Sequence, residues 1–112
     1  DAAHNLFKSN NYLWCLFIGH LIIEKSLKAH WVNIFDETPP KIHDLVRLAT
    51  KTNIELGKFD LDFLDELNKF NLEARYPDYK QEMYRICTEE YTTLIFEKII
   101  ELFQWLKSQL TY

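Results

Sequence analysis

Glycine and proline are scarce in this chain of 112 residues, which contains two glycines and three prolines. These residues punctuate turns, so their scarcity argues against many short strands and favours long helices. The sequence has no glycine-rich phosphate loop, no dinucleotide-binding turn and no ligand spacing typical of zinc. We therefore expect an all-helical protein without a metal site and without a cofactor.

A dominant basic charge is also missing, because the net charge is −4. This balance argues against a general nucleic-acid coat protein, although a local basic patch remains compatible with it. Cys15 and Cys87 both fall within helical patterns and lack the spacing of a disulfide framework. Buried, reduced thiols are typical of intracellular proteins, so we expect a cytoplasmic location.

The stretch Tyr12–Phe35 is apolar on every side of a helical wheel, which predicts a central helix surrounded by others. His20, Glu24 and Lys28 interrupt it at i, i+4 and i+8, so they share one face. Buried charge has to be paired or directed at a polar group. Glu24, Lys25 and Lys28 also argue against a membrane span.

Four shorter or flanking helical patterns accompany this stretch. They cover residues 1–8, 41 to about 52, 60 to about 71 and 79 to about 110. Asp60 is an N-cap candidate, and Asp78 with Gln81 has the spacing of a capping box. These patterns predict one all-α domain over residues 1–112, an antiparallel up-and-down bundle of four to five helices.

The last pattern carries a second apolar face outside its core stripe. One face is expected to pack inside the domain and the other to meet a partner. The second face consists of Tyr84, Phe96, Ile100 and Trp105.

Three short motifs follow one another along the chain, and together they extend over much of its length. They are Glu-Lys-Ser-Leu-Lys-Ala at 24–29, Lys-Ile-His-Asp-Leu at 41–45 and Arg-Tyr-Pro-Asp at 75–78. Together they resemble the HEPN domain family. The resemblance implies an all-α bundle that forms a homodimer. It also implies a prokaryotic protein that pairs with a minimal nucleotidyltransferase as toxin and antitoxin, and that binds nucleotides or cleaves RNA.

The ribonuclease branch of that family uses an arginine followed about four to six residues later by a histidine. Here the last histidine is His43 and the first arginine is Arg47, so this order never occurs. The chain resembles instead the branch that carries Arg-Tyr-Pro-Asp. The resemblance therefore implies binding rather than cleavage through the Arg/His motif.

Lys25, Lys28 and Arg75 form the candidate ligand-binding set, with ammonium and guanidinium groups suited to phosphate. Tyr76 is the fourth member, because its ring could stack on a base. Each has a structural alternative. Glu24 and Lys28 could hold helices in register, Arg75 could cross to Glu24, and Tyr76 could plug the end of the bundle.

A second set is interpreted as a structural charge network, consisting of His20, Glu24, His43, Asp44 and Asp78. His20 reads as a satisfied core histidine. Asp44 suits the start of a helix, where a negative charge is favourable. His43 is the one candidate general base, although the adjacent Asp44 cannot face it on a helix.

Three functional hypotheses follow. The first is a binding and interaction module that forms a homodimer, pairs with a nucleotidyltransferase, takes a nucleotide or RNA phosphate and does not contact a membrane. The second is a divergent metal-independent ribonuclease that uses His43 with Arg75 or Lys28. The third is a purely structural helical dimerisation domain.

Overall fold

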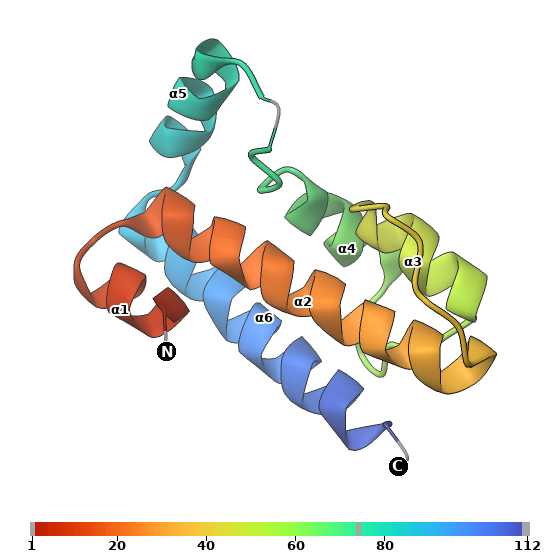
Figure 1. Cartoon of the computed structure of the whole chain (residues 1–112). Coiled ribbons are helices and arrows are strands. Elements are labelled where there is room, and N and C mark those ends of the chain that lie inside the picture. The colour runs from red at the N-terminus through yellow and green to blue at the C-terminus, as the bar shows by residue number, and fades with distance from the viewer. Residues whose placement is uncertain (1, 74, 111–112) are drawn as a thin grey trace.

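The computed structural model describes residues 2–73 and 75–110, and within them it forms helices and no strand (Figure 1). The helices are α1 (Ala2–Lys8), α2 (Tyr12–Phe35), α3 (Leu45–Thr52), α4 (Leu61–Asn68), α5 (Pro77–Ile86) and α6 (Glu89–Ser108). The all-α bundle is confirmed, with one helix more than expected. Among the described residues, none of these helices has the length and apolar character needed to cross a membrane.

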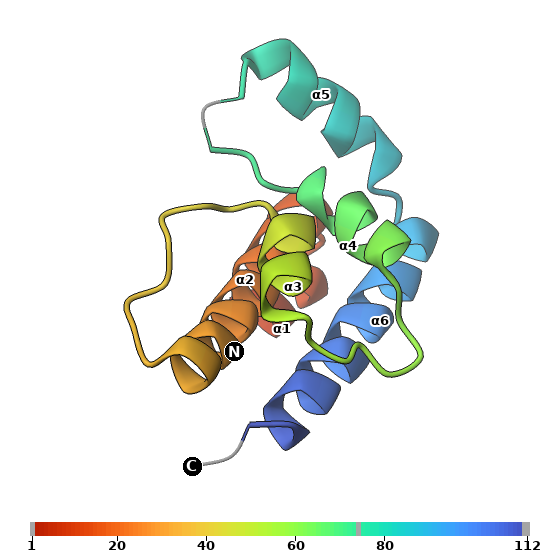
Figure 2. The same cartoon turned by 90° about the vertical axis from the view of Figure 1, so that its right-hand side faces the viewer.

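Helix α2 has the predicted bounds and lies at the centre of the molecule. Helices α1, α3 and α6 all pack against it (Figures 1 and 2). Because neighbours cover it from several sides, its buried positions are not confined to one stripe. They are Leu13, Cys15, Leu16, Gly19, His20, Ile23, Glu24, Leu27, His30 and Trp31.

Helices α2 and α6 run in the same direction, contrary to the expected antiparallel order. Gly19 faces Ile99, and a Cβ added at Gly19 would stand 2.7 Å from the Ile99 Cδ1 atom. Further along both helices, the His30 Nε2 donates to the Leu106 carbonyl at 2.7 Å. The residue numbers of the contacting positions increase together along α2 and α6, as expected for parallel helices.

The expected helix over residues 79–110 is divided into two helices, α5 and α6. The prediction of a continuous helix is wrong. Thr88 ends it by capping α6, since its side chain accepts from the Tyr91 backbone N–H at 3.1 Å. Glu89 and Glu90 follow in the first turn, where acidic side chains favour a helix start.

Two other helix starts also depend on side-chain caps. Asp60 caps α4 by accepting from the Phe63 N–H at 3.0 Å, as predicted. Asp44 caps α3, so that helix begins at Leu45 rather than at Lys41. Residues 36–44 therefore form a connection outside the helices, which leads from the end of α2 to the start of α3.

The start of α5 differs from the expected capping box. Tyr76 occupies the N-cap position without a side-chain cap bond, and Pro77 takes the first helical position. Asp78 lies inside the first turn, so its predicted role as the cap with Gln81 is wrong. Seen from the side, α5 stands at one end of the molecule, away from α3 and from the C-terminal ends of α2 and α6 (Figure 2).

Much of the second apolar face of the expected last helix packs inside the domain. The Phe96 ring stacks on Phe7 of α1, with ring centroids 5.7 Å apart. The Trp105 Nε1 donates to the Glu55 carbonyl in the connection between α3 and α4 at 2.9 Å. Tyr84 differs because it belongs to α5 and is exposed.

Candidate functional site

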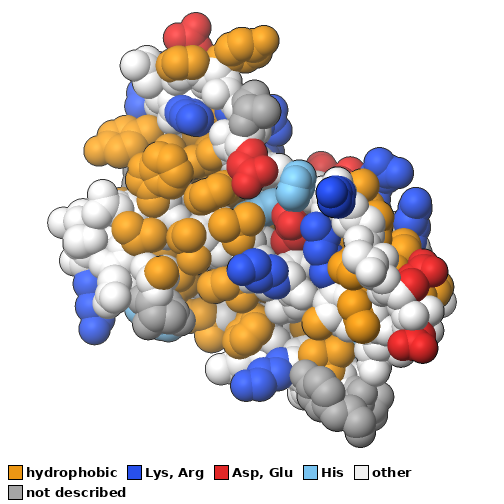
Figure 3. All heavy atoms as spheres, in the orientation of Figure 1, with side chains coloured by type: hydrophobic (Ala, Val, Ile, Leu, Met, Phe, Trp, Pro, Cys, Tyr) orange, Lys and Arg blue, Asp and Glu red, His pale blue; other side chains and the backbone are white. Residues whose placement is uncertain are grey.

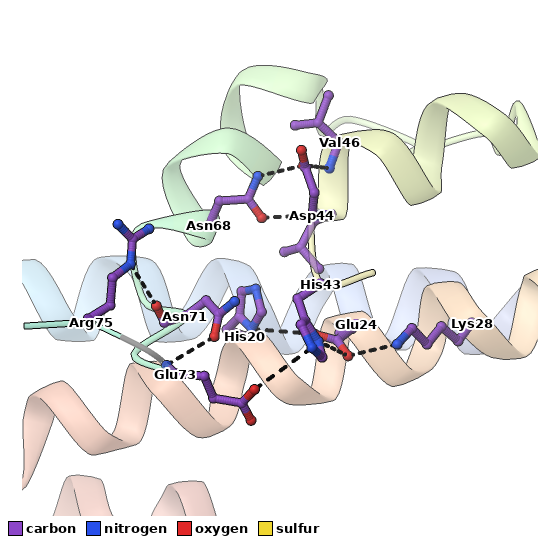
Figure 4. Close-up of polar contacts among 11 residues, drawn as sticks. His20, Glu24, Lys28, His43, Asp44, Val46, Asn68, Asn71, Glu73 and Arg75 are labelled. Atoms are coloured by element: carbon purple, nitrogen blue, oxygen red, sulfur yellow. Dashed lines mark hydrogen bonds and ion pairs between the residues drawn. The ribbon is translucent and has the colours of Figure 1, made fainter. Parts of the chain in front are cut away.

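The Glu24 cluster consists of Glu24, Lys28, His43 and His20, and its centre is the buried Glu24 carboxylate (Figure 4). The Lys28 Nζ donates to Oε2 at 3.1 Å. The His43 Nδ1 lies 3.0 Å from Oε2 and 3.1 Å from Oε1. The His20 Nδ1 stands 4.0 Å from Oε1. One carboxylate thus holds a lysine and a histidine side by side.

This contact fixes the tautomer of His43. An ionised carboxylate only accepts hydrogen bonds, so the proton lies on Nδ1. The other ring nitrogen, Nε2, stands 3.8 Å from the Glu73 Oε2, and the His43 side chain is 46% exposed. His43 therefore turns one nitrogen toward the buried anchor and the other toward the surface.

The segment that carries His43 is held by a second polar group. The Asp44 Oδ1 accepts from the Val46 N–H at 3.0 Å and from the Asn68 Nδ2 at 2.9 Å. Asn68 in turn accepts from the Leu45 N–H at 3.0 Å. These bonds tie the start of α3 to the end of α4, so the His43 backbone is placed by two helices.

Burial and charge act in opposite directions on the two buried members of the Glu24 cluster. Burial raises the pKa of the Glu24 carboxyl, but the hydrogen bonds from His43 and Lys28 outweigh it, so the pKa lies below its usual value. Burial lowers the pKa of His20. Neither His20 ring nitrogen makes a hydrogen bond of ordinary length among the described residues, and the ring instead faces the Glu24 carboxylate at 4.0 Å.

The Arg75 side chain points away from Glu24 (Figure 4). Its Nε donates to the Asn71 carbonyl at 3.3 Å, and its guanidinium carbon lies 4.4 Å from the centroid of the Tyr79 ring. An Arg75–Glu24 pair is therefore not formed. The nearby residue that does reach the Glu24 cluster is Glu73, through His43.

Tyr76 extends into solvent and is 82% exposed. The alternative in which its ring plugs the end of the bundle is therefore wrong. An exposed ring is available to a ligand, whereas a plug would be covered.

Lys25 lines a groove of about 620 Å³ between α1, α2 and α6. The groove has a largely apolar lining that includes Ile22, Ile100 and Phe103, and Lys107 is a second lysine on its wall. Lys25 and Lys28 lie three residues apart on α2, so they are neighbours on adjoining parts of its surface. The three predicted cations thus occupy three places, with Lys28 in the Glu24 cluster, Lys25 in the groove and Arg75 beside Tyr79.

Comparison with known families agrees with this architecture. The family model described as the HEPN domain matches residues 1–109. This chain belongs to the HEPN domain family. No curated protein and no solved structure gives a significant match to the HEPN chain.

The remaining network candidate, Asp78, lies in the first turn of α5, where its charge favours the helix start. Metal coordination receives no support from the described part of the HEPN chain, in which no group of three or more histidine, cysteine, aspartate or glutamate residues could hold an ion.

Sequence reasoning missed two residues of this region. It found Glu24 but not its bond to His43, and it overlooked Glu73 and Asn68. The Glu24–His43 and Asp44–Asn68 bonds join positions 19 and 24 residues apart. No local spacing signals such contacts.

Proposed function

We propose that this HEPN chain binds the phosphate of a nucleotide or RNA at the surface that Lys28 and His43 form over Glu24. The observation that carries this proposal is the shared carboxylate. Glu24 is buried, whereas the side chains of Lys28 and His43 are 20% and 46% exposed. Both side chains are therefore held in place from below while they reach solvent: Lys28 offers its ammonium group, and His43 donates through Nε2 when both of its ring nitrogens carry a proton. Positioned donors of this kind bind an oxyanion with little loss of side-chain freedom.

Glu73 defines the edge of this surface. Its carboxylate is 3.8 Å from the His43 Nε2, which is too long for a strong ion pair, and its side chain is exposed. An incoming phosphate would replace Glu73 as the anion facing His43. Lys25 lies within one turn of Lys28 on α2, and Arg75 lies two residues beyond Glu73. Both lie outside the Glu24 cluster, so each would meet a further phosphate of a longer ligand.

The test compares Lys28→Gln with Lys51→Gln, which removes an exposed lysine from α3. Binding is measured by calorimetry with AMP and with an oligoadenylate of about ten nucleotides. We expect Lys28→Gln to weaken both ligands. We also expect it to reduce the salt dependence of RNA binding by about 0.7 in slope, the value for one phosphate contact on a single strand. Lys51→Gln should leave both unchanged.

Lys28→Arg shows whether a loss of binding comes from the missing charge or from altered folding, because arginine keeps the positive charge. It should retain more binding than Lys28→Gln at equal thermal stability. If the two lysine-to-glutamine variants behave alike, or if the unchanged protein binds neither AMP nor the oligoadenylate, the proposed site is wrong.

Membership of the HEPN family supports a wider proposal, in which the chain forms a homodimer in the cytoplasm of a prokaryote and pairs with a nucleotidyltransferase in a toxin–antitoxin system. Exposed apolar side chains on α2 and α6, among them Trp14, Val32 and Leu94, are available for protein contacts. Sedimentation velocity tests the first part of this proposal. A species of twice the chain mass is expected, and a monomer at all concentrations would contradict it.

RNA cleavage is a second candidate, favoured by the orientation of His43. With its proton on Nδ1 facing Glu24, Nε2 has a lone pair that can accept a proton from a ribose hydroxyl. Lys28 would stabilise the phosphate charge that develops. The purified chain should then cut single-stranded RNA in the presence of EDTA, and His43→Ala should abolish cleavage. Intact RNA, or cleavage that survives His43→Ala, would remove this candidate.

A further inference from the structure

Helix α5 presents two exposed aromatic rings with a lysine between them. Tyr76, Lys80 and Tyr84 follow one another at i, i+4 and i+8, so they lie along one side of the helix. The Lys80 N–H bonds to the Tyr76 carbonyl at 3.2 Å, which places Tyr76 in register with the helix. The two tyrosines are 82% and 69% exposed. We call this side of α5 the tyrosine face.

The packing of α5 does not depend on these two rings. Met83 is the buried residue of the helix. Tyr79 is half-buried, and its hydroxyl donates to the Lys69 carbonyl at 2.7 Å. The tyrosine face is instead part of the outer surface, and hydrophobic side chains gather over α5 and the start of α2 in the space-filling view (Figure 3).

The acidic side chains of α5 lie on a different side of the helix from the tyrosine face. At about 100° per residue, Asp78 and Glu82 project from the side of the helix away from Tyr76 and Lys80. Within α5 the tyrosine face therefore carries a cation and no carboxylate. At its N-terminal end, Arg75 adds a second cation, which is held against the Tyr79 ring. The face has this character although the whole chain has a net charge of −4.

We propose that the tyrosine face is a stacking track for single-stranded RNA. This inference rests on the proposed phosphate site, from which the strand would continue past Glu73 and Arg75 onto α5. Aromatic rings alternating with cations suit a single strand, because bases stack on the rings while the cations meet the phosphates.

The geometry also sets the length of strand required. Tyr76 and Tyr84 are separated by eight residues, which corresponds to about 12 Å along a helix. A strand with stacked bases advances about 3.4 Å per nucleotide, so the rings are about three to four steps apart. A strand shorter than about four nucleotides can reach only one of them.

The experiment uses the full chain and measures binding of oligoadenylates of two and about ten nucleotides, with AMP as the probe that carries a single phosphate and cannot span both rings. We expect Tyr76→Ala and Tyr84→Ala each to weaken binding of the longer strand by about fivefold or more, the usual effect of losing one stacked base. Tyr76→Phe and Tyr84→Phe keep the ring and should bind normally. Leu61→Ala, which removes an exposed apolar side chain from α4, should have no effect.

AMP separates this inference from the proposed function. Both alanine variants should bind AMP as the unchanged chain does, since the phosphate site is intact. If they also keep full affinity for the longer strand, the stacking track is wrong and the phosphate site stands. If the chain binds AMP but no RNA, the stacking track is likewise wrong and the phosphate site stands. If it binds neither, both proposals fail.

Strand length and self-association provide the remaining decisive outcomes. The effect of the alanine substitutions should be larger for the longer strand than for the dinucleotide, and equal effects would contradict a track that spans both rings. Sedimentation velocity should be unchanged by Tyr76→Ala and Tyr84→Ala. Loss of a dimer with full RNA binding would show that the tyrosine face is a protein interface, which overturns the inference.

Discussion

Replacing Glu24 with glutamine removes the charge at the centre of the Glu24 cluster while keeping the shape of the side chain. Glu24 accepts hydrogen bonds from Lys28 at 3.1 Å and from His43 at 3.0 Å. Glutamine retains one acceptor oxygen but carries no negative charge to attract the Lys28 ammonium and to polarise the His43 N–H bond. Glu24→Gln should therefore loosen both donors without opening a cavity.

The magnitude follows from the exposure of the partners. Lys28 is partly exposed, so its ion pair is worth about 1 kcal/mol, the upper end of the range for surface pairs. The hydrogen bond from the half-exposed His43 contributes about 1 kcal/mol. Because glutamine keeps part of this bonding, we expect Glu24→Gln to lower the free energy of unfolding by about 1–2 kcal/mol at pH 7.

The difference should depend on pH. The pKa of Glu24 lies below its ordinary value in the folded chain, because His43 and Lys28 bond to the carboxylate. Such a group stabilises the fold fully above its unfolded pKa, and this contribution is lost as the pH falls through the folded value. Urea unfolding of the unchanged chain and of Glu24→Gln should therefore give free energies that differ at pH 7 and converge toward the acid limit of folding.

Glu37→Gln is the matched control, because Glu37 lies in the exposed connection after α2. It should leave the free energy of unfolding within experimental error at every pH. A Glu24→Gln protein as stable as the unchanged chain at pH 7 would refute the reasoning. A loss of stability that stayed constant on acidification would also refute it, since the charge would then not be its cause.

Two further predictions concern the segments around the candidate site. Asp44→Ala should lower the free energy of unfolding in urea by about 1–2 kcal/mol, because it removes the α3 cap and the bond from Asn68, whereas Asp62→Ala on exposed α4 surface should cost less. Burial raises the pKa of Cys15 and Cys87 to about 11, so iodoacetamide at pH 8 should label them slowly in the folded chain and rapidly in urea. Rapid labelling without urea would contradict their buried placement.

The central part of the fold could be predicted because local sequence patterns determine it. Tyr12–Phe35 is apolar on all sides and ends at a connection containing two prolines, and its bounds are confirmed. Asp60 has the position of an N-cap and is one. The division at Thr88 was missed because the apolar period continues across it, and the cap signal was outweighed by that period.

The Glu24 cluster could be predicted only along α2. The spacing of His20, Glu24 and Lys28 places them on one line, but the partner from outside the helix depends on where the 36–44 connection runs. His43 reaches Glu24 only because that connection returns to the middle of α2. The alternative in which Arg75 crosses to Glu24 is wrong because its side chain contacts Asn71 and Tyr79, which are close to it in sequence.

The central claim is that Lys28 and His43 together receive a phosphate above Glu24. Nitrogen-15 NMR of the histidine rings during titration with AMP tests it most directly, with the His43 signals assigned from a His43→Gln sample. We predict that the His43 Nε2 resonance shifts on binding, and that this shift is lost in Lys28→Gln. An unchanged His43 resonance at saturating AMP, or an equal shift in Lys28→Gln, would contradict the claim.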